Sequence, residues 1–150
     1  ARVPKIDLAT VPVRTGTNYP DPHAAAVSDR RWQGVGDAGF LTALGVNLCT
    51  IPPGVWSSQM HVHTHEDEFV IVLSGTARVV TDCGEYTLSP GEMAAFPADG
   101  EAHHLRNEGT EPLVFLVASS RDSQDGCAYP GIDMKVGPDN IYRHEDGTPY

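Results

Sequence analysis

QMHVHTHEDEFVIVLSG, residues 59–75, combines three alternate histidines, an acidic turn and an apolar run that ends in Ser-Gly. Alternate side chains of a β-strand share one face, so His61 and His63 are expected to point the same way. Two imidazoles two residues apart on one strand are well placed to bind a divalent metal ion together. The stretch therefore predicts a candidate metal site on a β-strand.

The third histidine, His65, would join this pair only if the strand stayed straight. THED, residues 64–67, is a run of four polar residues and predicts a turn instead. The next strand then begins at Glu68, and its first side chain is expected to point back inward. Alternation would place Glu68 on one face with Val70 and Val72, which would form an apolar wall beneath a metal ion. His65 is expected to be a loop residue.

The rest of the chain predicts an all-β protein. Strand-like runs include FLTALGVNLCTI at 40–51, EYTLSPGE at 85–92 and EPLVFLVAS at 111–119. The chain has 15 glycines and 12 prolines without a repeat, which indicates many turns rather than disorder. Short strands with frequent turn signals are typical of a sandwich or a barrel.

The 150 residues are most simply one domain in three parts. Residues 40–119 are expected to form the barrel. Residues 1–39 are expected to form an extended N-terminal arm with a short helix, which begins at the Asp-Pro pair after position 20 and runs through about Arg30. Residues 120–150 are polar and rich in glycine and proline, so we expect loops that pack on the barrel.

Charge and cysteine content limit the partners and the compartment. The formal net charge is −10, so binding to nucleic acid or to an anionic membrane is not expected. No apolar stretch reaches the roughly 20 residues that span a bilayer. Three cysteines without a C-x-x-C pair predict no disulfide framework and favour a cytoplasmic location.

Two spaced motifs resemble those of the cupin superfamily. The first cupin motif is a glycine, five residues, His-x-His, three or four residues, a glutamate, six residues and a glycine. Here His61, His63, Glu68 and Gly75 follow that spacing. Six residues rather than five lie between Gly54 and His61, which is a small departure.

The second cupin motif is a glycine, five residues, Pro-x-Gly, two residues, a histidine, three residues and an asparagine. Gly91, Pro97, Gly100, His103 and Asn107 match it in order, with one additional residue between the proline and the second glycine. The resemblance covers about residues 40–119.

The resemblance implies a double-sheet jelly-roll barrel and a metal site. His61, His63 and Glu68 match the ligands of the first motif, and His103 matches the ligand of the second. His104 is the alternative to His103 and is otherwise expected to point outward. A ligand set of this kind implies one divalent transition metal, Mn, Fe, Ni, Co or Zn.

The cupin fold hosts many activities, so the fold does not select one. The first hypothesis is an isomerase, epimerase or lyase that acts on a small oxygenated substrate, with the metal as a Lewis acid. Glu68 is a candidate base in addition to its role as a ligand, and Tyr86 is a second candidate if it faces inward.

Two alternatives stay open, a non-haem iron dioxygenase and a non-catalytic binder of a small, sugar-like molecule. Single-domain cupins commonly pair through an edge strand, so a homodimer is also expected. Arg78 and Arg106 are the charged strand residues considered for an anionic substrate, and alternation gives neither a secure inward position. Four apolar side chains are expected to form the pocket walls: Val70, Val72, Leu105 and Phe115.

Overall fold

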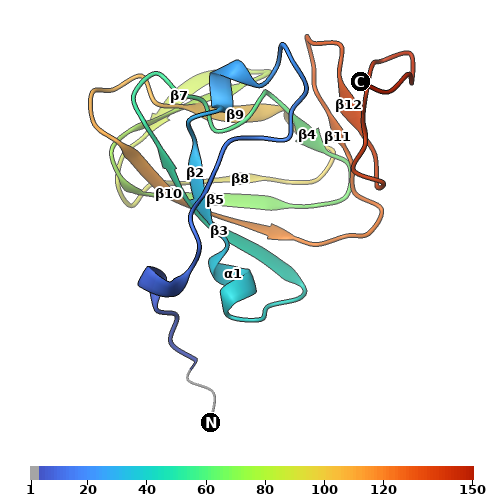
Figure 1. Cartoon of the computed structure of the whole chain (residues 1–150). Coiled ribbons are helices and arrows are strands. Elements are labelled where there is room, and N and C mark those ends of the chain that lie inside the picture. The colour runs from blue at the N-terminus through green and yellow to red at the C-terminus, as the bar shows by residue number, and fades with distance from the viewer. Residues whose placement is uncertain (1–3) are drawn as a thin grey trace.

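The computed structural model describes residues 4–150 and is built almost entirely of antiparallel strands. Figure 1 shows two main sheets that face each other. The predicted all-β jelly roll is confirmed. The hydrogen-bonded sheets stay separate, however, so they do not close into one continuous barrel. No helix in the described part of the chain is long and apolar enough to cross a membrane.

The larger sheet has six strands in the order β1-β2-β3-β10-β5-β8. Its centre is β10, which pairs with β3 along its whole length and with β5 on the other side. The strands of this sheet are β1 (Arg14–Thr15), β2 (Arg31–Gln33), β3 (Leu44–Ile51), β10 (Leu113–Ser120), β5 (Glu68–Ser74) and β8 (Met93–Phe96).

The facing sheet has three strands in the order β7-β6-β9, namely β7 (Gly84–Leu88), β6 (Ala77–Thr81) and β9 (His103–Arg106). Apolar side chains of the two sheets alternate with polar ones and meet in a single core, as period-two patterning requires. The buried core residues are Ile51, Val70, Val72, Ala77, Val79, Leu88, Phe96, Leu105, Leu113 and Phe115.

A third sheet joins the C-terminal tail to the H-x-H strand. Its order is β13-β12-β11-β4, with β4 (Val62–His63), β11 (Cys127–Ala128), β12 (Lys135–Val136) and β13 (Tyr142–Arg143). Figure 1 shows these strands together at one end of the molecule, near the C-terminus. The tail is mostly loop, as expected, but three two-residue strands pair its backbone with β4 and extend a sheet.

The arm also differs from its prediction. The predicted helix is reduced to a 3-10 turn, η2 (Ala25–Val27), and its N-cap residue Ala24 makes no side-chain capping bond. The chain then enters β2, which pairs with β3 and so extends the larger sheet. The other helical segments are the 3-10 turn η1 (Leu8–Thr10) and the four-residue α1 (Val35–Ala38).

Gly75, the last residue of the first motif, ends β5 with a left-handed backbone, φ 78°. A Cβ atom at this position would lie 2.5 Å from the carbonyl oxygen of Pro112. Only glycine fits both the backbone angle and this close approach. The motif therefore carries a glycine here because the turn into β6 passes directly against the start of β10.

Candidate metal centre

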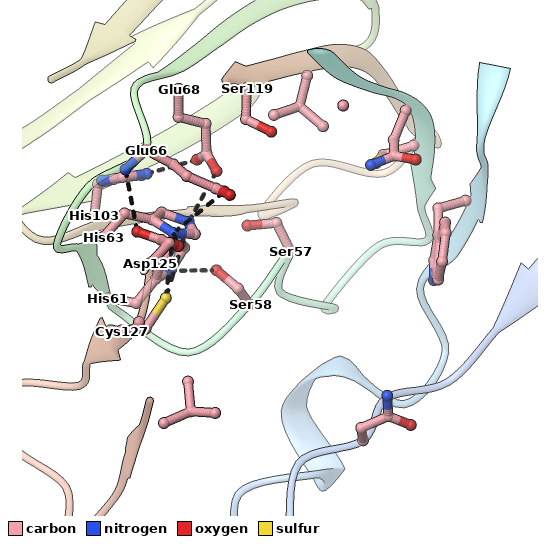
Figure 2. A pocket seen from close by; sticks show the side chains of 18 of the residues that line it. Ser57, Ser58, His61, His63, Glu66, Glu68, His103, Ser119, Asp125 and Cys127 are labelled. Atoms are coloured by element: carbon pink, nitrogen blue, oxygen red, sulfur yellow. Dashed lines mark hydrogen bonds and ion pairs between the residues drawn. The ribbon is translucent and has the colours of Figure 1, made fainter. Parts of the chain in front are cut away.

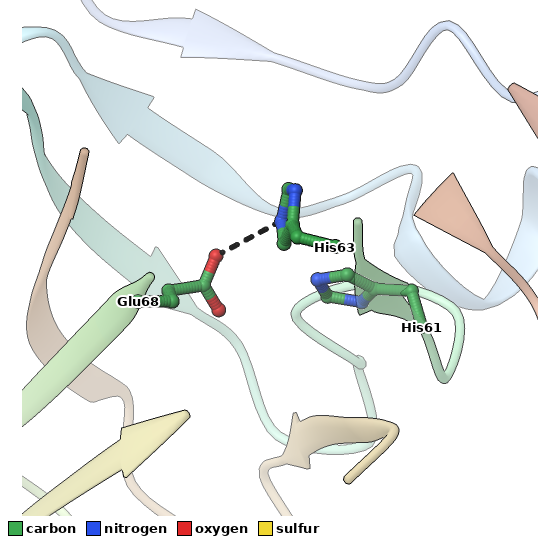
Figure 3. A group of neighbouring side chains, drawn as sticks. All are labelled: His61, His63 and Glu68. Carbon is green, nitrogen blue, oxygen red and sulfur yellow. Dashed lines mark ion pairs between the residues drawn. The ribbon is translucent and has the colours of Figure 1, made fainter. Parts of the chain in front are cut away.

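His61 and His63 lie on either side of Val62 and both line the same pocket. After the 64–67 turn, β5 begins at Glu68, whose carboxylate comes back to face them, as Figure 3 shows. The ligand-type atoms of His61, His63 and Glu68 all lie within 4.8 Å of one another. Strand alternation and the turn thus bring together three side chains that are separated by up to seven positions in sequence.

His103 reaches the cluster from the facing sheet. Its backbone forms an antiparallel bridge with His61, with N–H···O distances of 3.1 and 2.9 Å. Its ring nitrogen Nε2 lies 2.8 Å from Glu68 Oε1. The ring of Phe96 stacks parallel to the His103 ring at a centroid distance of 3.6 Å, which fixes the orientation of the imidazole. The structure therefore places all four predicted ligands side by side.

In both His61 and His103 the ring nitrogen Nδ1 is hydrogen-bonded to a backbone carbonyl oxygen. His61 Nδ1 lies 2.9 Å from the carbonyl oxygen of Gln59, and His103 Nδ1 lies 3.1 Å from that of Glu101. A carbonyl oxygen can only accept, so each Nδ1 must donate its hydrogen. For His61 the lone pair is then on Nε2, which is the arrangement found in metal-binding histidines. His103 Nε2 instead donates to Glu68 Oε1 at 2.8 Å.

His63 has a charged partner instead. Its Nδ1 donates to Asp125 Oδ2 at 2.7 Å, and its Nε2 lies 3.3 Å from Glu68 Oε2. Cys127 Sγ lies 3.4 Å from the same Nδ1. Figure 2 shows Asp125 and Cys127 reaching the cluster from the C-terminal segment. The tail therefore supplies groups that orient a candidate ligand.

Burial and hydrogen bonding set the protonation of this cluster. Burial would raise the pKa of the Glu68 carboxyl, but hydrogen bonds from His103 and His63 outweigh it and hold that pKa far below its usual range. Burial would lower the pKa of His63, but its bonds to Cys127, Glu68 and Asp125 raise the pKa to about 12. Burial lowers the pKa of His61 to about 4.

These residues fit a divalent transition metal. Three imidazoles and one carboxylate are the donor types that Mn, Fe, Co, Ni and Zn accept. His61 already directs its Nε2 lone pair away from its backbone partner, and Glu68 is ionised. Such a set leaves coordination positions for a substrate.

The remaining candidates lie elsewhere. His65 is exposed in the turn between β4 and β5. Tyr86 lies on β7, is 41% exposed and is not among the residues that line the pocket, which corrects its prediction as an inward-facing base. His104 points away from the pocket, yet it is buried rather than outward, because it packs on Trp56 and accepts from Arg106 Nε.

The pocket beside the cluster has a volume of about 1220 Å³. Val70, Leu105 and Phe115 contribute to its walls, whereas Val72 lies in the core and does not line it. The other walls carry many hydroxyl and amide groups, including Ser57, Ser58, Ser119, Asn18 and Asn47. A wall of this composition suits a ligand with several hydroxyl groups better than an apolar one.

Sequence reasoning missed Glu66, Asp125, Cys127 and Arg30, which all line the pocket. Glu66 was visible as part of the acidic turn. Its Oε2 atom lies 4.0 Å from His63 Nδ1. Asp125 and Cys127 gave no local signal, since only the pairing of β11 with β4 brings them to His63.

Comparison with known proteins decides the family. A family model for the cupin domain matches residues 47–119. A solved structure from Silicibacter pomeroyi, called a sugar phosphate isomerase from a cupin superfamily, is 38% identical over 98% of this chain and 96% of its own, with a TM-score of 0.93. The chain belongs to the cupin superfamily. A second solved structure, from Acidithiobacillus ferrooxidans, is 37% identical over 79% of this chain and 72% of its own, with a TM-score of 0.69.

Curated relatives of this cupin are much longer proteins. Mannose-1-phosphate guanylyltransferase 2 of Escherichia coli O157:H7 is 34% identical over 101 residues, which are 67% of this chain and 19% of that protein. The alginate biosynthesis protein AlgA of Pseudomonas putida is 32% identical over the same length, which is 18% of that protein. The cupin thus spans about a fifth of the curated relatives that it matches.

Proposed function

We propose that this cupin is a divalent-metal-dependent isomerase of a sugar or a sugar phosphate. The observation that carries the proposal is the convergence of His61, His63, Glu68 and His103 on a large pocket whose other walls are rich in hydroxyl and amide groups. Similarity over nearly the whole chain to a protein called a sugar phosphate isomerase supports the same chemistry.

The bound metal would supply a Lewis acid that polarises the carbonyl oxygen of the substrate. Aldose–ketose isomerisation then needs a base that takes the proton from the carbon beside the carbonyl and returns it to the carbonyl carbon. The hydroxyl proton passes between the two substrate oxygens in the same conversion. The base therefore returns the proton that it removed, and the conversion neither consumes nor releases a proton overall.

Glu68 is poorly suited to act as this base. Its pKa is held far below the usual range by His103 and His63, and a carboxylate so strongly stabilised attracts a proton weakly. Glu66 is a better candidate. It lines the pocket, and Figure 2 shows its side chain beside the cluster. The backbone N–H of Asp122 donates to Glu66 Oε1, which holds this side chain in place.

The proposal is tested by metal analysis and by isomerisation assays with a panel of pentoses, hexoses and their phosphates. Glu68→Gln is expected to lose metal and activity together. Glu66→Gln is expected to keep its metal and to lose about 100-fold or more in kcat. Glu108→Gln, in an exposed turn, is the matched control and is expected to change neither quantity.

Wild-type protein that retains metal but isomerises no member of the panel would contradict the isomerase proposal. Oxygen uptake with the iron-loaded protein would then support the dioxygenase alternative. A protein that binds metal without a substrate and binds sugar saturably, but converts none of it, would support the binding-only alternative. A protein whose metal content is unchanged by both His61→Ala and Glu68→Ala would refute the site itself.

A further inference from the structure

Arg30 is a half-buried cation on the wall of the same pocket. Its Nε donates to the carbonyl oxygen of Gly16 at 3.2 Å, and its Nη1 donates to the carbonyl oxygen of Ser57. Both acceptors are neutral. Among residues 4–150 no carboxylate forms an ion pair with Arg30, so its positive charge is held in place but not compensated.

Three other arginines of this acidic chain pair with carboxylates. Arg78 pairs with Glu85 at 2.6 Å, and Arg143 pairs with Asp139 at 2.6 Å. Arg121, which also lines the pocket, pairs with Asp37. Arg106, considered from the sequence for an anionic substrate, instead lies over the ring of Trp56 and donates to His104. Arg31 lines the pocket without an ion pair among residues 4–150, but it is exposed, whereas Arg30 is half-buried and held by two carbonyl oxygens.

One of the tyrosines that line the pocket lies directly against this cation. The guanidinium of Arg30 lies 5.8 Å from the centre of the Tyr19 ring. Tyr19 makes edge contacts at 5.6 Å with Tyr129 and Tyr142, which line the same pocket. Burial raises the pKa of Tyr19 to about 12, so its hydroxyl keeps its proton and can donate a hydrogen bond. Arg30 thus has a phenol beside it and, among residues 4–150, no carboxylate paired with it.

A chain of ring contacts gives the position of Arg30 relative to the metal centre. Tyr129 contacts Tyr19 on one side, and on the other side its ring centre lies 6.2 Å from that of His61. Arg30 is thus linked to His61 through two tyrosine rings, and both residues line the same pocket. A small molecule that fills this pocket can contact both ends.

We propose that Arg30, with the phenols of Tyr19, Tyr129 and Tyr142, forms the subsite for the phosphate group of a phosphorylated sugar. The inference rests on the proposed function and narrows its substrate class from sugars to sugar phosphates. A guanidinium binds phosphate oxygens through two parallel N–H donors, and its charge is then compensated by the ligand. The carbonyl and hydroxyl end of the same molecule would face the histidine cluster drawn in Figure 2.

The test compares fructose 6-phosphate, fructose and gluconate by calorimetric titration of the metal-loaded protein. Wild-type protein is expected to bind fructose 6-phosphate about 10- to 100-fold more tightly than fructose. Arg30→Gln is expected to abolish that difference, and Arg30→Lys to restore part of it. Arg31→Gln is the matched control, since Arg31 also lines the pocket but is exposed, and it is expected to behave as wild type.

Equal binding of fructose and fructose 6-phosphate by wild-type protein would overturn the proposal. A phosphate preference that survives in Arg30→Gln, or that is lost in Arg31→Gln instead, would do the same. Tighter Arg30-dependent binding of gluconate than of the phosphate would show an anion subsite for a carboxylate and would refute the assignment to phosphate. Inhibition of wild-type ligand binding by inorganic phosphate, but not by chloride at equal ionic strength, is expected even if Arg30→Gln does not fold.

Metal titration distinguishes failure of the phosphate-subsite proposal from failure of the proposed isomerase function. Arg30→Gln is expected to bind Zn²⁺ as tightly as wild type, because Arg30 contacts none of the predicted ligands. A wild-type protein without metal binding would contradict the proposed isomerase. Stabilisation of that metal-free protein by inorganic phosphate, lost in Arg30→Gln, would still support the subsite.

Discussion

Replacing Asp125 by Asn tests how the C-terminal tail controls the metal centre. The carboxylate accepts from His63 Nδ1 at 2.7 Å through Oδ2, and from the backbone N–H groups of His65 and Glu66 at 2.9 and 3.1 Å through Oδ1. An asparagine can retain its oxygen toward the two backbone donors. Its amide nitrogen then faces His63, where a donor would meet a donor.

Metal binding requires His63 to lose the hydrogen on Nε2 and keep the one on Nδ1, where it would meet the asparagine amide. The tautomer that avoids this conflict carries its hydrogen on Nε2. That nitrogen faces Glu68 and is the atom required by a metal. Loss of a partner that orients a ligand costs about 10- to 100-fold in metal affinity, or about 1.4 to 2.8 kcal/mol. The two backbone bonds of Asp125 survive, so the free energy of unfolding of the metal-free protein is expected to fall by only about 1 kcal/mol or less.

The assay is competition of the protein with a chelating dye for Zn²⁺, together with urea unfolding of the metal-free protein. Asp122→Asn is the matched control, because this exposed residue lies in the same loop and its side chain touches no predicted ligand. A dissociation constant for Asp125→Asn within about twofold of wild type would refute the role of the tail in orienting His63. A large loss of stability without a change in affinity would assign Asp125 to folding alone.

Three further outcomes are expected. Because the pKa of His63 is raised to about 12, a metal ion must displace one proton from it, and metal affinity should rise by up to about tenfold per pH unit. Calorimetry in buffers of different ionisation enthalpy is expected to show this proton release near neutrality. Metal binding without proton release would contradict the protonation of His63. Leu113→Ala, at a fully buried position, is expected to lower the free energy of unfolding by about 2–5 kcal/mol, whereas Leu73→Ala, at a 49% exposed position, should cost much less, and equal losses would contradict the core assignment. Gly91→Ala is expected to destabilise the protein by roughly 1–2 kcal/mol, because Gly91 has a positive φ, and Gly75→Ala is expected to destabilise it more. Both glycines have a positive φ, but only Gly75 lacks space for a Cβ atom. Thermal unfolding that ranks the two variants in reverse would refute the argument.

The sequence was informative where function depends on local spacing. His61, His63 and Glu68 could be grouped because strand alternation and a four-residue turn are local rules, and Gly75 could be placed because a tight turn selects its residue type. His103 came from the second motif rather than from any local rule. These residues all lie in the part of the chain that resembles other cupins.

The same reasoning failed where contacts are distant in sequence. Asp125 lies in the tail, where composition indicated loops, and Arg30 lies at the expected end of the short helix of the arm. Nothing local showed that one would reach His63 and the other the pocket wall. Strand pairing at long range, which propensity does not encode, decided both positions. Tyr86 was a candidate base only if it faced inward, yet it lies in the β6–β7 hairpin on a strand whose side chains are mostly exposed.

The pairing of β11 with β4 also has a consequence for the order of folding. His63 and Asp125 are 62 positions apart, and β4 and β11 share only two residue pairs. The pairing of β3 with β10 spans as many positions but has eight residue pairs and a buried apolar face, so the tail is expected to dock after the core and to open before it. A folding intermediate in which the two main sheets are already packed would hold its histidines close together and yet bind metal weakly. Tight binding of metal during refolding would then report when the last thirty residues dock. Binding of Zn²⁺ would follow core formation rather than accompany it.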